Sequence, residues 1–335
     1  MKIRFVYLAL VAMLAVAIGA TSAAEVKPIN WGILAVESQD NLMKRWGPIL
    51  EAMAKKMGIP IKPFFATDYT GVIEAMRFGK VDVVQYGNKS AMTAVDRANA
   101  EVFAKVIERD GSAGYYSILV THKDNTHLNS LDDVLKCDQS IDFGIGDPQS
   151  TSGFLVPTTF IFAAHDIDPR ACFKTVRNAS HEANLLSAAT RQVDVATAND
   201  RAMYFRLQRN KPEAFEQLKE IWRSPLIPPD PFAWRKDLPE DVKAKIFYGM
   251  MSFGRIGAPE TVREERNLLN EMGFKGFEPS SDLQLLPIRE MEMTKELSKI
   301  KGDETLTDTE KETQVAELQT QIEKVRAMAK ELPNM

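Results

Sequence analysis

The sequence predicts an α/β protein of two lobes, followed by a helical C-terminal extension. Short apolar runs alternate with segments of helical periodicity, which is typical of βαβ units and of sheets with parallel strands. The alternation occurs in two separate parts of the chain, and its 335 residues exceed what one compact core usually contains. We therefore expect two α/β lobes with a ligand cleft between them, because ligands of such sheets bind beyond the carboxyl ends of the strands.

The N-terminal segment has the features of an export signal. Lys2 and Arg4 supply positive charge, residues 5–20 form an apolar run without a charged side chain, and small residues follow up to Ala24. The run is too short to span a bilayer comfortably, which favours a cleaved signal over a membrane anchor. We expect residues 1–24 to be a signal peptide, cleaved near Ala24, and the mature protein to be periplasmic.

The first α/β series belongs to a first lobe, for which we expect residues 25–115 and 225–286. Apolar residues recur on one face of the stretch 39–57, and Asp68 is suited to cap the helix that follows it. The expected elements are a strand at 29–36, a helix at 39–57, a strand at 61–65, a helix at 70–78 and a strand at 81–85.

The second series belongs to a second lobe, residues 116–224. Its expected elements are strands at 115–121, 141–145, 173–176 and 193–197, with helices beginning near 150 and near 182. The Pro-rich stretch 224–231, SPLIPPDP, is unsuited to a central strand and is typical of a crossing back to the first lobe. The first lobe is therefore expected to be discontinuous.

Composition disfavours some classes of function. The formal net charge is −4 and the sequence shows no clustered basic face, which disfavours nucleic acid as a partner. Cys137 and Cys172 are the only cysteines, too few for a zinc site of their own. They form either a disulfide, as an oxidising compartment allows, or two buried thiols, and the sequence leaves both alternatives open.

The stretch 144–153, GIGDPQSTSG, carries the most informative chemistry. It lies between a predicted strand and a predicted helix, and its glycines allow the backbone to approach a ligand closely. Ser150, Thr151 and Ser152 bring three hydroxyl groups to a helix start, whose free N–H groups favour an anion. The alternative is that Ser150 merely caps the helix. No Gly-Lys-Ser/Thr follows, so the stretch is not a Walker loop.

Four further residues are candidates for the same site. His181 is expected at the start of another helix, where a neutral imidazole can donate to a ligand oxygen; a surface or capping histidine is the alternative. Tyr69 and Tyr115 lie where the chain enters or leaves predicted elements, and they either wall a ligand or pack the core. Asp230, between two prolines, either faces a cationic group or serves a turn.

Residues 287–335 are expected to form C-terminal helices. This segment is highly charged, and five apolar residues in it recur at near-heptad spacing. They are Val315, Leu318, Ile322, Val325 and Leu332. They form a seam that packs either on the protein's own surface or against a second copy, as a homodimer.

Several separated motifs occur in one order between about residue 29 and about residue 295. They are FFATDYTG, MRFGKVDVVQYGNKSAMTAVDRANA, the Gly-Tyr pair at 114 and 115, GDPQSTSGFLVP, the Ala-Ser-His-Glu run at 179–182, QVDVAT, SPLIPPDP and SSDLQLLPIR. Together they closely resemble the periplasmic phosphonate-binding protein of ABC importers, the PhnD family. The resemblance implies a type II periplasmic-binding-protein fold, ligand capture without catalysis or cofactor, and an ABC transporter permease as partner.

The resemblance also implies roles for the candidate residues. Four of them match residues that hold the phosphonate oxygens in the family: Ser150, Thr151, Ser152 and His181. Tyr69 and Tyr115 match residues that line the cleft. Asp230 matches a carboxylate that meets the ligand's amino group in members that bind 2-aminoethylphosphonate.

One position departs from the family pattern. Where the pattern for the aminophosphonate has a second carboxylate after QVDVAT, this chain has Ala198-Asn199-Asp200-Arg201. Arg201 repels an ammonium group unless Asp200 or Asp230 compensates. We therefore expect a phosphonate whose substituent is a methyl group, a carboxylated group or another group without positive charge. Phosphite or another small oxyanion is the alternative.

Two other classes of function remain as alternatives. An enzyme acting on a phosphorus ester needs a nucleophile with its base, or a metal set, and the sequence shows neither a histidine pair nor a carboxylate cluster at ligand spacing. A sensory binding module that reports to a receptor shares these sequence features with a transport protein, so the sequence does not separate the two.

Overall fold

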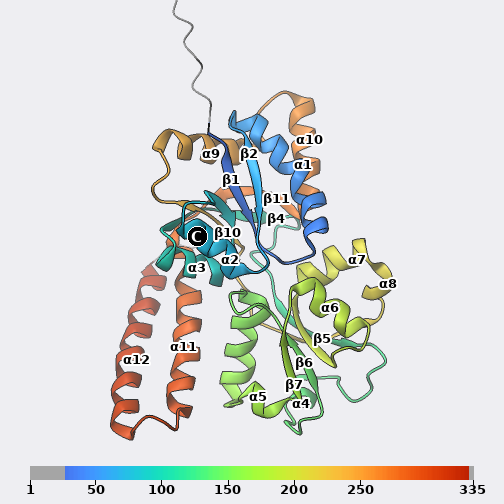
Figure 1. Ribbon diagram of the computed structural model, residues 1–335, viewed down its shortest axis with the longest axis vertical. Helices are drawn as coiled ribbons and strands as arrows, with labels where there is room; N and C mark the ends of the chain where they lie inside the picture. Colours follow the sequence, from blue (N-terminus) through green and yellow to red (C-terminus); the bar gives the residue numbers. More distant parts are fainter. Residues whose placement is uncertain (1–26, 332–335) are drawn as a thin grey trace, which may run out of the picture.

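The computed structural model describes residues 27–331, in which two mixed β-sheets form the centres of two lobes (Figure 1). The strand order is β11-β4-β10-β3-β1-β2 in the first sheet and β7-β6-β8-β5-β9 in the second. The predicted α/β class with two lobes is thereby confirmed. The signal peptide predicted for residues 1–24 lies outside the described residues.

The elements of the first lobe come from two parts of the chain. They are β1 (Ile29–Ile33), α1 (Gln39–Met57), β2 (Ile61–Phe65), α2 (Tyr69–Arg77), β3 (Val83–Gln85), α3 (Asn88–Arg97), β4 (Ala100–Glu108), β10 (Pro231–Arg235), α9 (Glu240–Ser252), α10 (Pro259–Met272) and β11 (Phe274–Pro279).

The elements of the second lobe are consecutive, and η1, η2 and η4 among them are π-helices. They are β5 (Ser117–His122), α4 (Leu131–Val134), β6 (Asp142–Ile145), η1 (Thr151–Leu155), η2 (Thr158–Phe162), the 3₁₀ turn η3 (Ala163–His165), α5 (Pro169–Cys172), β7 (Thr175–Asn178), α6 (His181–Ala189), β8 (Val195–Asn199), η4 (Arg201–Leu207), α7 (Gln208–Asn210), α8 (Pro212–Phe215) and β9 (Leu218–Arg223).

Helix α1 illustrates why the sequence forms these elements. The Ser38 hydroxyl accepts the Asn41 N–H at its start, and Gly58, with a φ of 65°, ends it in the left-handed conformation. Its predicted apolar face is buried: Leu42, Trp46, Ile49, Leu50 and Met53. Both ends agree with the predicted range, because local capping residues and an amphipathic pattern define this helix.

The predicted parallel strands make up part of each sheet. β1 pairs in parallel with β2 and β3, and β6 pairs in parallel with β7 and β8. β10, β4, β11, β5 and β9 pair antiparallel, so both sheets are mixed. β7 begins at Thr175, two residues after the predicted start, because Phe173 ends α5 and stacks on Phe143 with ring centroids 4.5 Å apart.

The chain passes between the lobes at two neighbouring segments, after β4 and before β10. An antiparallel bridge joins them: Tyr115 N donates to Ile227 O at 3.0 Å and Ile227 N donates to Tyr115 O at 2.8 Å. Gly114 permits this approach, because a Cβ there would lie 2.0 Å from the Ile227 carbonyl oxygen. The paired segments therefore set how the two lobes face each other.

Cys137 and Cys172 form a disulfide in the second lobe. The sequence left a disulfide and two buried thiols as alternatives, and the structure contains the disulfide. The bridge joins the turn after α4 to the end of α5. Within residues 27–331, no helix has the length and hydropathy needed to cross a membrane.

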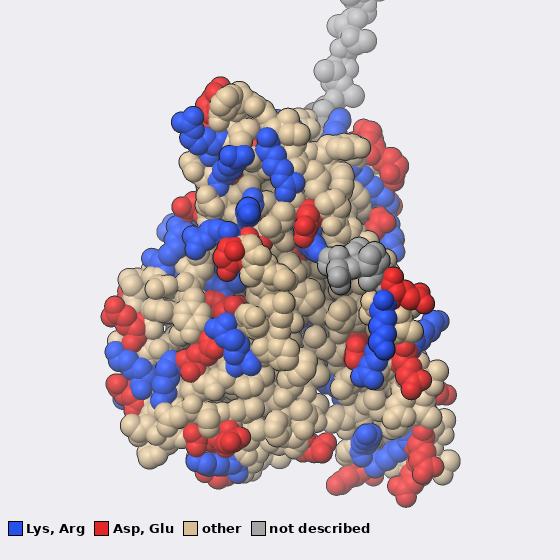
Figure 2. Space-filling view, turned by 180° about the vertical axis from the view of Figure 1, so that it is seen from behind, with Lys and Arg blue, Asp and Glu red and all other residues tan. Residues whose placement is uncertain are grey.

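The C-terminal segment follows the 3₁₀ turn η5 (Asp282–Leu285) and forms two helices, α11 (Leu286–Gly302) and α12 (Asp308–Glu331), which fold into a hairpin (Figure 1). Of the predicted seam, Ile322 and Val325 are buried, Val315 and Leu318 are half-buried, and Leu332 lies outside the described residues. Seen from behind, the hairpin carries charged side chains of both signs, interspersed (Figure 2). The seam packs within its own chain, and the homodimer alternative gains no support.

Candidate functional site

A cavity of about 310 Å³ lies between the two lobes. Both lobes contribute to its wall, and all the residues that the sequence singled out line it: Tyr69, Tyr115, Ser150, Thr151, Ser152, His181, Arg201 and Asp230. The structure thus brings these candidates together in one place. Their roles in holding a ligand remain predictions.

Three consecutive residues after β6, which we call the hydroxyl turn, begin η1: Ser150 is its cap, and Thr151 and Ser152 are its first two residues. Ser150 Oγ accepts the Gly153 N–H at 3.0 Å, so the cap that the sequence offered as an alternative is present. A Cβ on Gly153 would lie 2.9 Å from Ser150 Oγ, and Gly146 N donates to Gly153 O at 2.8 Å, so the turn needs glycine there. The cap uses Ser150 only as an acceptor, and its O–H hydrogen remains a donor.

The other two hydroxyls of the turn are held in the same manner. Thr151 Oγ1 accepts the Lys89 N–H at 2.8 Å, and Ser152 Oγ accepts from Asn199 Nδ2 at 3.2 Å. Both residues are 2 % exposed. In each case a protein N–H fixes the oxygen and leaves the hydroxyl hydrogen able to donate. Together with the N–H groups of a helix start, this set of donors suits an oxyanion.

His181 is the first residue of α6 and is buried beside the hydroxyl turn. Its Nε2 lies 3.4 Å from Ser150 Oγ, and its Nδ1 is buried without a partner among the described residues. Burial, aided by the positive charge of Arg206, lowers the pKa of the imidazole to about 3. A neutral imidazole has one donor and one acceptor, so it can face either an ionised or a protonated ligand oxygen. Ser180 is the helix cap, and the alternative of a surface or capping histidine is wrong.

Tyr69 forms another part of the wall, as the first residue of α2. Asp68 caps that helix by accepting the Gly71 N–H at 2.7 Å, as the sequence predicts. The Tyr69 N–H donates to Asp147 Oδ2 of the second lobe at 3.2 Å. Burial raises the pKa of the phenol, so the hydroxyl stays protonated and available as a donor.

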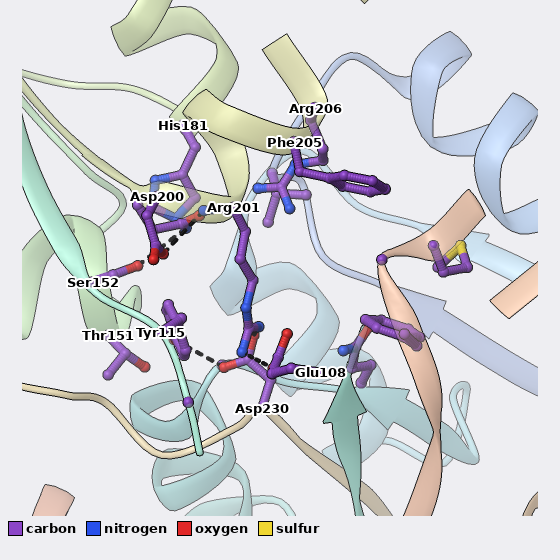
Figure 3. Close-up of a pocket in the computed structure, with 18 of the residues that line it drawn as sticks. Glu108, Tyr115, Thr151, Ser152, His181, Asp200, Arg201, Phe205, Arg206 and Asp230 are labelled. Carbon is purple, nitrogen blue, oxygen red and sulfur yellow. Dashed lines mark hydrogen bonds and ion pairs between the residues drawn. The ribbon is translucent and has the colours of Figure 1, made fainter. Parts of the chain in front are cut away.

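The far end of the cavity holds a cluster of one guanidinium and two carboxylates, which we call the Arg201 cluster (Figure 3). Arg201 Nη1 lies 3.3 Å from Asp230 Oδ2, and Arg201 Nη2 donates to Glu108. The guanidinium carbon lies 3.9 Å from the centroid of the Tyr115 ring, and the Tyr115 hydroxyl donates to Asp230 Oδ1 at 2.9 Å. Asp230 therefore faces a cation, and that cation is a side chain of the protein.

Burial is the main electrostatic effect on both carboxylates of the cluster. It raises the pKa of Glu108 to about 7 and raises the pKa of Asp230, while the Arg201 charge acts against the rise in each case. Arg201 belongs to η4 of the second lobe, whereas Glu108 and Asp230 belong to the first lobe. The cluster thus joins the lobes across the cavity.

Sequence reasoning missed Glu108, Asn199 and Lys89. Glu108 ends β4 and is only 5 % exposed, and the only signal for it was a charged residue at the end of an alternating apolar strand. Asn199 ends β8 directly after the QVDVAT motif and its neighbouring alanine, next to the residues that were singled out. Lys89 contributes its backbone N–H to Thr151 and so carries no side-chain signal.

Further contacts hold the lobes together on either side of the cavity. Thr93 Oγ1 donates to Gln149 Oε1 at 2.8 Å, beside the Lys89 contact. Elsewhere, Glu37 of the first lobe lies 2.6 Å from Arg206 Nε of the second. The cavity is therefore bounded by lobes that are in contact.

Comparisons with known proteins identify the family. The model of the family described as "ABC transporter, phosphonate, periplasmic substrate-binding protein" matches residues 31–285. The chain is 46 % identical to the phosphonates-binding periplasmic protein of Escherichia coli, over 89 % of this chain and 85 % of that protein. It is 28 % identical to the phosphate-import protein PhnD of Mycolicibacterium smegmatis, over 65 % of this chain and 69 % of that protein.

Solved structures agree with this comparison. The binding-protein component of an ABC phosphonate transporter from Pseudomonas aeruginosa matches with a TM-score of 0.86 and 42 % identity, over 90 % of this chain and 97 % of that one. A protein from Prochlorococcus marinus in complex with methylphosphonate matches with a TM-score of 0.68 and 20 % identity, over 79 % and 97 %, and shows the same fold. The chain belongs to the family of periplasmic phosphonate substrate-binding proteins of ABC transporters.

Proposed function

We propose that this chain captures a small phosphonate in the cavity between its lobes and delivers it to the permease of an ABC importer. The hydroxyl turn carries this proposal: at a helix start, three buried hydroxyls have their oxygens held by N–H groups, so each O–H can turn to donate to a ligand. A phosphonate head has three oxygens that accept hydrogen bonds, so head and turn are complementary. Membership of the family supports the same class of ligand.

The candidate residues then divide between the two ends of the ligand. Four hold the phosphonate head: Ser150, Thr151, Ser152 and His181. Tyr69 and Tyr115 line the cavity beside it, and Arg201 and Asp230 lie at the substituent. The proposed lobes are residues 25–115 with 225–286, and residues 116–224; membership of the two sheets supports these limits.

Phosphate or another bare oxyanion is the second candidate, favoured by the 28 % identical relative that is named for phosphate import. The cavity, however, extends beyond the hydroxyl turn to Asp230 and Arg201, and this space suits an organic substituent. Titration calorimetry with methylphosphonate, phosphite, phosphate and sulfate measures which of these ligands binds most tightly. We expect methylphosphonate to bind most tightly. If methylphosphonate does not bind, or if sulfate binds as tightly as methylphosphonate, the proposal is contradicted.

We propose that the chain binds its ligand without catalysis. The contact of 3.4 Å between Ser150 Oγ and His181 Nε2 is the kind a nucleophile makes with its base, but such a pair needs a third group that orients the imidazole. His181 Nδ1 has no such partner in residues 27–331. Incubation with a phosphonate monoester should release no alcohol, and release that disappears in Ser150→Ala would show catalysis.

We also propose export to the periplasm with cleavage near Ala24. The family is periplasmic, which supports this location. N-terminal sequencing of the protein from a periplasmic extract tests the cleavage position; a sequence that still begins at Met1 contradicts it.

A further inference from the structure

The Arg201 cluster leaves the carboxylates of the cavity already paired. Both oxygens of Asp230 have partners, since Oδ1 accepts from the Tyr115 hydroxyl and Oδ2 lies 3.3 Å from Arg201 Nη1. Glu108 accepts from the other terminal nitrogen of Arg201. The Tyr115 ring covers one face of the same guanidinium. The cation that these groups are arranged to hold is therefore part of the chain.

The four other arginines that line the cavity also have partners. Arg206 and Arg45 both pair with Glu37, at 2.6 and 3.4 Å. Arg223 lies 3.7 Å from Asp200. The guanidinium of Arg109 lies over the Phe205 ring at 4.8 Å. Among residues 27–331, Arg201 is the side chain that forms ion pairs with both Asp230 and Glu108.

We propose that Arg201 occupies the place of a cationic ligand group, so that the site selects phosphonates whose substituent carries no charge. This inference rests on the proposed function and names the substrate class of the same site. A ligand ammonium must take Asp230 or Glu108 from Arg201 and leave a half-buried guanidinium short of a partner. A ligand carboxylate must lie beside the buried Glu108 and the half-buried Asp230, which already share the Arg201 cation. An uncharged substituent disturbs neither pair.

Two ligands of nearly equal size and shape test this selection: 2-hydroxyethylphosphonate and 2-aminoethylphosphonate. Phosphonoacetate supplies the negatively charged comparison. By calorimetry at pH 7.5, we expect the wild-type protein to bind the hydroxyethyl compound about tenfold or more tightly than either charged ligand. In Arg201→Gln, the freed carboxylates can hold an ammonium, and we expect the aminoethyl compound to become the tighter of the pair.

Arg209→Gln is the matched control. Arg209 also forms an ion pair between the lobes, with Glu271, but both side chains are largely exposed and neither lines the cavity. This variant should keep the wild-type preference. Thermal unfolding monitored by circular dichroism verifies that each variant is folded, and if Arg201→Gln does not fold, the wild-type ratio alone decides.

The outcomes separate the two levels of proposal. Wild-type protein that binds 2-aminoethylphosphonate as tightly as the hydroxyethyl compound overturns the selection by Arg201, as does an unchanged ratio in a folded Arg201→Gln. Wild-type protein that binds none of the three phosphonates overturns the proposed function itself.

Discussion

The side-chain amide of Asn199, at the end of β8, donates to the hydroxyl oxygen of Ser152 at 3.2 Å. The carbonyl oxygen of the same amide accepts the Ala202 N–H at 2.7 Å, at the start of η4. One buried amide thus links a donor at the anion end of the cavity to the helix that carries Arg201. The hydroxyl of Ser152 is oriented before any ligand arrives, which lowers the entropic cost of binding.

Ser152→Ala should therefore weaken phosphonate binding. The substitution removes one donor to a buried anion and leaves the Asn199 amide without its acceptor, and we expect a loss of about 1–3 kcal/mol, roughly 5- to 150-fold in Kd. Calorimetry with methylphosphonate measures it. Ser112→Ala is the control, because Ser112 lines the cavity but its hydroxyl donates to Gly114 O at 2.9 Å. Equal, small losses in both variants would contradict the assignment of Ser152.

His181 should make the protein less stable as the pH falls. Its pKa is lowered from 6.5 to about 3, so between these values the unfolded chain binds a proton that the folded chain does not. The contribution to stability is complete above pH 6.5 and is lost as the pH falls toward 3. Urea unfolding of the wild type and His181→Gln at pH 7.5 and 5 tests this. The wild type should lose more stability than the variant; identical losses would show that His181 titrates normally.

Glu108 should have the opposite effect to His181 on stability: its contribution grows as the pH falls over the same range. Its pKa is raised from 4.5 to about 7, so the folded chain binds a proton that the unfolded chain releases. The contribution to stability is present below pH 4.5 and is lost as the pH rises through 7. Glu108→Gln removes it, and this variant should lose more stability than the wild type between pH 7.5 and 5. A pH dependence that matches the wild type would mean that Arg201 keeps Glu108 ionised.

Gly114→Ala should destabilise the crossing between the lobes. The new Cβ would lie 2.0 Å from the Ile227 carbonyl oxygen, so the paired segments must separate and two backbone hydrogen bonds weaken. We expect a loss of about 2–4 kcal/mol in the free energy of unfolding, measured with urea. Gly302→Ala is the control, because no heavy atom lies within 4 Å of a Cβ at that position. If Gly114→Ala loses no more stability than Gly302→Ala, the close approach of residue 114 to the Ile227 carbonyl is contradicted.

Local signals in the sequence were enough to predict much of the fold. The bounds of α1, the Asp68 cap and the helix start at Ser150 follow from capping residues and apolar periodicity within a few positions of one another. The π-helical winding of η1 was not predictable, since nothing in its five residues distinguishes it from an α-helix.

The candidate site was predictable where several chemical groups gather in one motif, as they do at Ser150–Ser152. Glu108 and Lys89 could not be found in this way, because their partners are about 60 residues or more away in the other lobe. Such contacts depend on how the two crossing segments set the lobes, which no local pattern specifies. Arg201 was noticed only because it departs from the pattern of the family.

Glu37→Gln should lower the free energy of unfolding far more than the same substitution at an exposed ion pair. Glu37 is buried between two arginines, Arg206 of the second lobe at 2.6 Å and Arg45 of α1 at 3.4 Å. Its removal leaves two positive charges facing each other in a buried place, and breaking a buried pair in this way costs about 3 kcal/mol or more.

Urea unfolding measures this loss, and Glu51→Gln is the matched control. Glu51 lies on α1 and pairs with Lys55, but both side chains are largely exposed, so solvent screens the interaction and its loss should be small. The double variant Glu37→Gln with Arg206→Gln should recover part of the stability, because it removes one of the two opposing charges. In Glu37→Gln, the charge of Arg206 no longer has the Glu37 carboxylate as its partner. A double variant less stable than Glu37→Gln alone would therefore show that Arg206 stabilises the protein by its packing and not by its charge.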